Sequence, residues 1–210
     1  MKIIVFGGTG SIGRLVVEQA LERGHEVTVF TRNTASVAEE QARLTAVEGS
    51  VFEIGDVAPA IEGHDAVVVT LGNGSKGAVR SRGTATIVAA MRQVGVRRLI
   101  VQSTLGVGDS WENLDFLWKR VMFGFLLRKA YVDHVEQERV TRDSGLDWTI
   151  ARPAAFVDGP RTGEYLLGFG PRDAKTSLKI ARADVADFVV SQLTDNAWLG
   201  QTPALAYEAR

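Results

Sequence analysis

The segment from Lys2 to Gly13, KIIVFGGTGSIG, constrains the fold of this chain more than any other stretch. It opens with the short apolar run Ile3–Phe6, which is mostly β-branched and predicts a strand. Apolar residues then recur on one helical face, at Leu15, Val16, Ala20 and Leu21. The segment therefore predicts a strand, a glycine-rich turn and a helix in direct succession.

Three glycines at fixed spacing lie in that turn, Gly7, Gly10 and Gly13. Gly7 lets the chain turn sharply, Gly10 has no Cβ to keep a pyrophosphate away, and Gly13 lets the helix pack against the sheet. The helix N-terminus would then face the phosphates. Gly8 can also serve as the first glycine of a dinucleotide fingerprint, so the register stays open. A tight turn that binds nothing is the alternative.

Alternating strands and helices follow along the rest of the chain. Further strands are predicted at Glu26–Phe30, Leu44–Val47, Asp65–Leu71, Arg97–Gln102, Asp147–Ala151, Ser177–Ile180 and Pro203–Tyr207. Helices are predicted within Gly49–Gly63 and at Arg80–Val94, Lys129–Asp143 and Arg182–Leu193. This alternation is typical of an α/β fold with a doubly wound parallel, Rossmann-like sheet, and we expect one domain over residues 1–210.

Composition narrows the function classes. A formal net charge of −1 gives no electrostatic footprint for nucleic acid. The chain has no cysteine, which excludes disulfides, thiolate metal sites and cysteine nucleophiles, and we expect no metal. A strand that begins at Lys2 leaves no room for a signal peptide, and no stretch has the length to span a bilayer. We expect a cytoplasmic enzyme or binding protein.

The end of the second strand indicates the cofactor. NAD sites usually have an acidic residue there, which binds the ribose 2′-hydroxyl. Here the strand runs into Thr31, Arg32 and Asn33, with no carboxylate. A guanidinium matches a phosphate, so Arg32 favours NADP(H). A solvated loop arginine is the alternative.

Two further sites follow the next strands. Asp56 and Val57 would bring a carboxylate and a backbone N–H to the adenine edge, although Asp56 also suits a helix N-cap. Thr70, Leu71 and Gly72, at the carboxyl end of the fourth strand, would form the wall beside the nicotinamide ribose.

These motifs, in order, resemble those of the atypical short-chain dehydrogenase/reductases. The motifs that support the resemblance span nearly the whole chain. They are GGTGSIG, TRN, GDV, TLG, Ser103-Thr104, SGLDWTIARP and the late RADVA. The nearest branch is the NAD(P)H-binding one with flavin reductase/biliverdin reductase B and the NmrA-like proteins. That branch contains reductases, isomerases and cofactor sensors, so the resemblance leaves the substrate open.

The resemblance implies a set of cofactor contacts. Gly7, Thr9, Gly10, Ser11, Ile12 and Gly13 would contact the pyrophosphate, Arg32 the 2′-phosphate, and Asp56 and Val57 the adenine. Thr70, Leu71 and Gly72 would border the ribose, and Ser103, Thr104, Pro153, Ala154 and Ala155 would lie against the nicotinamide.

The chain departs from this superfamily in its catalytic acid. Typical members use a tyrosine four residues before a lysine, together with a serine from the fifth strand. Ser103 is in place and Tyr131 is a candidate proton donor, but Tyr131 is followed four residues later by Val135, so a Tyr-Lys acid at the standard spacing is absent. Reduction of a plain ketone needs an acid, whereas a reduced flavin or quinone is a delocalised anion that takes its proton from water. His134 is a candidate acid that could titrate near neutrality, against the alternative of a surface or core-edge histidine.

Two segments are positioned to cover an acceptor, Gly106–Lys119 and Phe156–Asp173, the second with Tyr165 as a further candidate acid. The apolar run Phe116–Leu127 predicts a helix packed on the sheet and the substrate mouth, with a partner surface or an interfacial membrane helix as alternatives.

The sequence thus predicts an NADP(H)-dependent oxidoreductase that passes hydride to a flavin, quinone or similar planar acceptor. The alternatives are a non-catalytic NADP(H) sensor and an epimerase or isomerase. We expect a monomer or homodimer.

Overall fold

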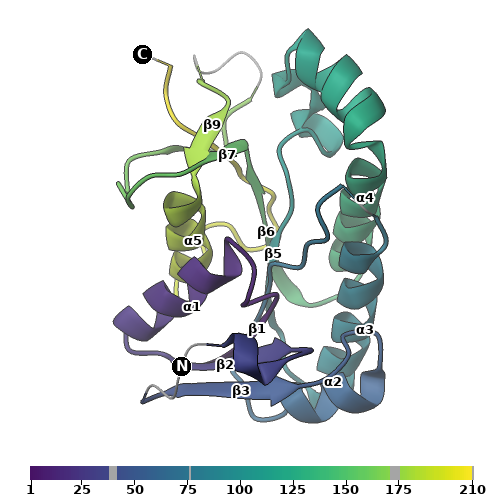
Figure 1. Ribbon diagram of the computed structural model, residues 1–210, viewed down its shortest axis with the longest axis vertical. Coiled ribbons are helices and arrows are strands. Elements are labelled where there is room, and N and C mark those ends of the chain that lie inside the picture. Colours follow the sequence, from purple (N-terminus) through teal and green to yellow (C-terminus); the bar gives the residue numbers. More distant parts are fainter. Residues whose placement is uncertain (38–41, 76, 171–175, 210) are drawn as a thin grey trace.

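A computed structural model describes residues 1–37, 42–75, 77–170 and 176–209, and an eight-stranded sheet runs through the centre of these residues (Figure 1). In spatial order its strands are β3 (Leu44–Glu48), β2 (Glu26–Thr31), β1 (Lys2–Phe6), β4 (Ala66–Val69), β5 (Arg98–Gln102), β6 (Asp147–Pro153), β10 (Ala204–Ala206) and β8 (Leu166–Leu167). All neighbours are parallel except β10 and β8. The predicted doubly wound sheet is confirmed.

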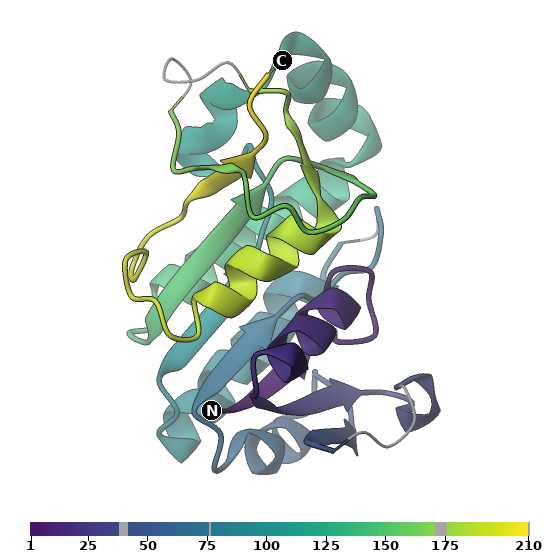
Figure 2. The same cartoon turned by 90° about the vertical axis from the view of Figure 1, so that its left-hand side faces the viewer.

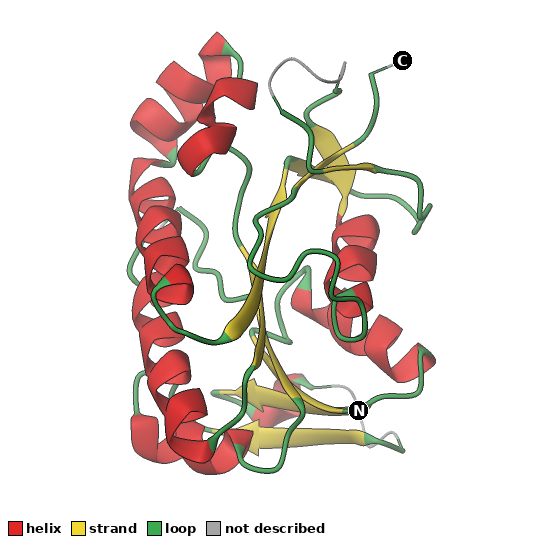
Figure 3. Ribbon diagram, turned by 180° about the vertical axis from the view of Figure 1, so that it is seen from behind, coloured by secondary structure: helices red, strands yellow, loops and turns green. Residues whose placement is uncertain are grey.

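Helices cover both faces of this sheet (Figure 3). One face carries α1 (Gly13–Glu22) and α5 (Arg182–Ser191), which pack against each other (Figure 2). The other face carries α2 (Ile54–Ile61), α3 (Val79–Val94) and α4 (Arg128–Arg142), packed in that order. The helices predicted at Arg80–Val94 and Lys129–Asp143 each begin one residue earlier in the structure.

Strand β1 shows why its sequence is apolar throughout. Ile3 and Val5 pack with the core on the side of α1 and α5, whereas Ile4 and Phe6 pack with the core on the side of α2 and α3. All four side chains are fully buried. A strand buried on both faces needs a continuous apolar run, because each of its two faces lies against a layer of helices.

The chain reverses its direction of travel across the sheet between β1 and β4. The first three strands run outward from β1, and the chain then returns to place β4 on the other side of β1. Loops at the carboxyl ends of β1 and β4 therefore diverge and leave a crevice, which is where open α/β sheets bind ligands.

The predicted covering loops contain short elements that sequence periodicity did not indicate. Strand β7 (Ala155–Val157) pairs in parallel with β9 (Lys179–Ala181) in a separate small sheet. Strand β8 lies within the predicted loop Phe156–Asp173, the last three residues of which fall outside the described residues. The other predicted covering loop, Gly106–Lys119, contains the 3₁₀ helix η2 (Gly108–Asn113), and a second 3₁₀ helix, η1 (Thr34–Ser36), follows β2.

The apolar run Phe116–Leu127 forms a π-helix, η3 (Trp118–Leu126), in which the amide of Leu127 donates to the carbonyl of Met122 at 2.6 Å. Phe123 is buried, but Phe116 and Phe125 are 75% and 80% exposed. The predicted packing against the substrate mouth is thus found for only part of the run. Among the described residues, no helix has the length and apolar character needed to cross a bilayer.

Candidate functional site

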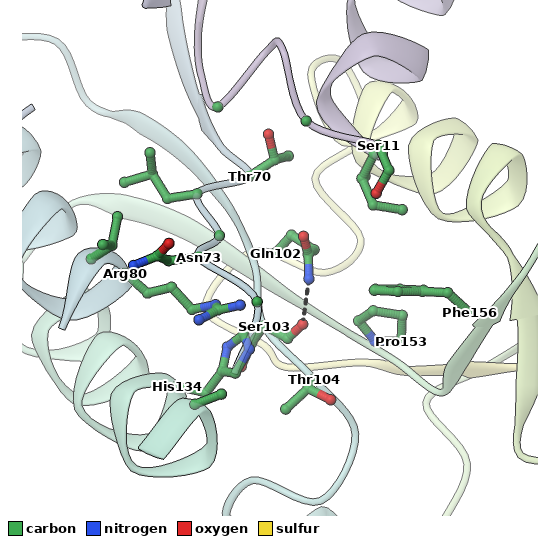
Figure 4. A pocket seen from close by; sticks show the side chains of 18 of the residues that line it. Ser11, Thr70, Asn73, Arg80, Gln102, Ser103, Thr104, His134, Pro153 and Phe156 are labelled. Carbon is green, nitrogen blue, oxygen red and sulfur yellow. Dashed lines mark hydrogen bonds between the residues drawn. The ribbon is translucent and has the colours of Figure 1, made fainter. Parts of the chain in front are cut away.

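A cavity of about 790 Å³ opens at the carboxyl ends of β1, β4, β5 and β6. It reaches from the glycine turn to the π-helix η3, and Figure 4 shows its central part. A cavity of this size is within the usual range for cofactor and ligand sites. The predicted site residues in its wall are Gly7, Thr9, Gly10, Ser11, Ile12, Arg32, Thr70, Leu71, Gly72, Ser103, Thr104, His134, Pro153, Ala154 and Ala155.

The glycine turn is built from close backbone contacts. Gly7 has a φ of +91°, and a Cβ there would lie 2.6 Å from the carbonyl oxygen of Thr70. A Cβ on Gly13 would overlap the carbonyl oxygen of Gly7. The sequence predicted that Gly13 lets α1 approach the sheet, but its tightest contact is with the turn itself. Gly10 closes the turn by donating its amide to Gly7 at 2.9 Å.

Arg32 follows β2 at the far end of the cavity. Its side chain is exposed and forms no ion pair or hydrogen bond with any residue that the structure describes. The neighbouring polar groups are engaged locally, because Thr31 donates its hydroxyl to the carbonyl of Asn33 and the Asn33 side chain caps η1. Among the described residues of this loop, the guanidinium of Arg32 is thus the group without a partner that could meet an anion.

The predicted adenine residues Asp56 and Val57 lie outside the cavity wall. Asp56 accepts the amide of Ser50 at 2.9 Å from the first turn of α2, and the helix N-cap is Glu53. Val57 is fully buried in the core. Asp56 thus holds the turn that contributes Ser50 to the wall and does not line the cavity itself.

Phe52, which the sequence did not single out, lies beside Ser50 in the cavity wall. The guanidinium of Arg82 lies 4.9 Å from the centre of its ring. Its ring is 39% exposed at the edge of the cavity, a property that the sequence alone does not reveal.

Ser103 directly follows β5 and is part of a buried ionic network. Its hydroxyl donates to Oε1 of Glu138 at 2.7 Å, and Glu138 also accepts from Arg152 at 2.9 and 2.8 Å. Glu138 is fully buried and Arg152 is 1% exposed. Arg152 in turn pairs with Asp109, and this hydrogen bond lowers the pKa of the Asp109 carboxyl. The proton of Ser103 is thus donated to a carboxylate.

Tyr131 lies outside the cavity wall, within a cluster of aromatic rings. Its ring centre lies 5.1 Å from that of Phe123 and 5.4 Å from that of Trp111. Its hydroxyl donates to the carbonyl of Gly106 at 3.3 Å. Burial, and then the charge of Glu138, raises the pKa of Tyr131. This environment suits a structural tyrosine better than the proton donor that the sequence suggested.

His134 lies in the cavity wall on α4, and only 7% of it is exposed. Burial, and then the nearby charge of Arg80, lowers the pKa of His134 to about 3. The sequence suggested titration near neutrality, but this imidazole is neutral there because a dry, positively charged setting disfavours a second charge.

The loop after β7 is tied to α5. Asp184 accepts the amides of Thr162 and Gly163 at 2.7 and 2.9 Å and also pairs with the hydroxyl of Tyr207. Tyr165 donates to Asp187 at 2.9 Å, and burial raises its pKa, so this second candidate acid serves to anchor the loop. Among the described residues, no cluster of three or more histidine and acidic side chains is placed to hold a metal ion.

Comparison with known proteins gives a consistent assignment. A family model described as NAD(P)H-binding matches residues 7–196. The protein YMR090W of Saccharomyces cerevisiae is 32% identical over 227 residues, which cover 98% of this chain and 92% of the yeast protein.

Two solved structures share the fold. A short-chain dehydrogenase/reductase of Veillonella parvula in complex with NADP has a TM-score of 0.82 at 19% identity, covering 97% of this chain and 93% of its own. ChuY of Escherichia coli O157:H7, an anaerobilin reductase, has a TM-score of 0.81 at 24% identity, covering 99% and 97%. At these identities the likeness extends to the fold alone.

Proposed function

Because the chain belongs to the NAD(P)H-binding family, we propose that it is an NADP(H)-dependent reductase that passes hydride to a flavin, quinone or similar planar acceptor. The choice of NADP(H) rests on two features. Arg32 places an exposed guanidinium in the cavity wall, and β2 does not end in a carboxylate. The solved Veillonella parvula relative, which binds NADP, supports the same choice.

The residues present fit such a cofactor. The glycine turn forms a cradle that side chains would fill, and the N-terminus of α1 offers amides and a positive dipole end to a pyrophosphate. Ser50 and Phe52 would border the adenine, and Pro153 and Ala154 the nicotinamide. The nicotinamide, when bound, supplies the hydride. The chain's task is to orient the two rings and to exclude water.

The observation that carries the choice of acceptor is that the described hydroxyl groups just after β5, and that of Tyr131 on α4, each donate to another group of the protein. Ser103 donates to Glu138, Thr104 to the carbonyl of Leu105, and Tyr131 to the carbonyl of Gly106. An alkoxide formed from a plain ketone would find no acid there, whereas a delocalised anion takes its proton from water. The aromatic and aliphatic wall formed by Leu114, Trp118 and Phe123 suits a flat ring.

An epimerase or isomerase would need a general base at the same place. The imidazole of His134 is a poor candidate, since its low pKa makes it a weak base. A sensor would bind NADP(H) at the same cofactor site. It would differ from a reductase only in that no acceptor oxidises the bound NADPH.

The test is the loss of NADPH absorbance in stopped flow with FMN, a naphthoquinone and cyclohexanone as acceptors. We expect oxidation with at least one planar acceptor and none above background with the ketone. Ketone reduction at a comparable rate would contradict the proposed acceptor class. Tight NADPH binding with no oxidation by any acceptor would replace the reductase with a sensor.

A further inference from the structure

Arg80, in the first turn of α3, is a buried arginine in the cavity wall. It is 9% exposed, and its Nε and Nη1 atoms are buried without any hydrogen-bond partner among the described residues. The remaining nitrogen, Nη2, lies 3.5 Å from where a Cβ on Gly72 would stand, at the carboxyl end of β4. A guanidinium carries five donors, and burying them unpaired is costly.

Asp133 is the nearest carboxylate to Arg80, but it is already engaged. It accepts the amides of Arg80 and Ser81 at 3.0 Å each, and the hydroxyl of Ser81 at 2.5 Å. Asp133 thus caps the N-terminus of α3 from a distant part of the chain. The distance from its Oδ2 to Nη1 of Arg80 is 3.7 Å, too long for a hydrogen bond. The pair therefore leaves the donors of Arg80 available.

His134 adds a second unpaired group at the same place. Its Nδ1 is buried and has no hydrogen-bond partner among the residues that the structure describes. Figure 4 shows its imidazole close to the guanidinium of Arg80, whose charge acts on it. The ring is neutral at physiological pH, so one of its nitrogens can donate a hydrogen bond while Arg80 supplies the charge.

We propose that Arg80 and His134 form a binding site for an anionic oxygen of the acceptor, a carboxylate on a planar ring system. The guanidinium fork matches a carboxylate in shape and charge, and a dry wall strengthens such a bond. The aromatic side of the cavity, with Trp118 and Phe123, would cover the ring while the anion anchors its edge. That the molecule with this carboxylate is also the hydride acceptor rests on the proposed reductase function.

Binding without turnover tests this site directly. We would titrate 2-naphthoate and the neutral 2-naphthamide into the protein by calorimetry, both with and without saturating NADP⁺. The wild-type protein should bind naphthoate at least about tenfold more tightly than naphthamide. This comparison needs no variant, so it stands even where a substitution fails to fold.

Three variants locate the preference. Arg80→Gln should bind the acid and the amide equally, and Arg80→Lys should retain part of the preference because it keeps the charge but loses the fork. Arg128→Gln is the matched control, since it removes the same charge from an exposed position in the first turn of α4, outside the cavity wall, and it should keep the full preference. Thermal unfolding of each variant establishes that it is folded.

The proposal would be overturned if the wild-type protein bound naphthoate and naphthamide equally. It would also be overturned if the preference for naphthoate survived Arg80→Gln. A loss of NADP⁺ affinity in Arg80→Gln without any change in ligand preference would assign the arginine to the cofactor instead. Selective naphthoate binding in a protein that reduces no acceptor would leave this site standing and refute the reductase function.

Discussion

At the scale of single residues, Arg32 has the most direct consequence for function. It extends from the end of β2 into the cavity wall and is exposed, and the described residues offer it no partner. A charge-assisted bond from such a group to a 2′-phosphate contributes about 1.5–3 kcal/mol. The unphosphorylated cofactor has nothing at that position for the guanidinium to bind.

Arg32→Gln should therefore weaken NADP⁺ binding roughly ten- to a hundredfold and leave NAD⁺ binding nearly unchanged. Arg14→Gln is the control, because Arg14 is exposed at the start of α1 but lies outside the cavity wall. Calorimetric titration of both nucleotides into both variants measures the effect. Equal weakening of the two nucleotides by Arg32→Gln would show that this residue does not recognise the phosphate.

Glu138 is a second residue whose role the structure defines. It holds Ser103 and Arg152 in a buried network, so its removal leaves a buried guanidinium with Asp109 as its one remaining partner among the described residues. Glu138→Gln should lower the free energy of unfolding by about 3–5 kcal/mol, the usual cost of breaking a buried ion pair.

Glu136→Gln is the matched control on the same helix. Glu136 pairs with Arg139 on the surface, at 46% side-chain exposure. Its loss should change stability by no more than about 0.5 kcal/mol. Urea unfolding measures both variants, and similar values for the two would mean that the buried network does not stabilise the fold.

At the scale of elements, the contact between the glycine turn and the start of α1 fixes the cofactor cradle. Gly13 is the first residue of α1. A Cβ on Gly13 would overlap the carbonyl oxygen of Gly7, so the backbone of the turn occupies the place that a side chain would need. The turn and the helix therefore cannot both keep their places if Gly13 gains a side chain.

Gly13→Ala should lower the free energy of unfolding by about 1–3 kcal/mol through overpacking, and should weaken NADP⁺ binding at least about tenfold. Gly55→Ala is the control in α2, where a Cβ would have nothing within 4 Å. It should stabilise the protein by up to about 1 kcal/mol, because glycine is a poor helix former. Thermal unfolding and nucleotide titration give both quantities. An unchanged Gly13→Ala protein would mean that the turn relaxes freely.

Some of these helices and strands can be predicted from the sequence and others cannot. Strands buried on both faces, such as β1 and β4, have apolar runs that predict them directly, and the long helices are amphipathic. Strand β8 has two residues and exists because it pairs with β10, far away in the chain, so no local pattern indicates it. The π-helix η3 carries Gly124 in its interior and turns only part of its apolar surface inward, which periodicity alone does not predict.

At the scale of the whole molecule, the strand order places the site. The reversal between β1 and β4 opens the crevice, and the local glycine motif then identifies what binds there. The lining of the cavity at the glycine turn and after β4, β5 and β6 was therefore predictable from sequence. The part proposed for the acceptor is assembled from α3, α4 and η3, and Arg80 was not predicted there because an arginine at the start of a helix is usually solvated.

The central claim is that this cavity holds a nicotinamide dinucleotide and selects its phosphorylated form. Calorimetric titration of NADP⁺ and NAD⁺ into the unmodified protein tests it most directly. One molecule of NADP⁺ should bind per chain, at least about tenfold more tightly than NAD⁺. Tighter binding of NAD⁺ would contradict the role given to Arg32, and no binding of either nucleotide at about millimolar concentration would contradict the dinucleotide site itself.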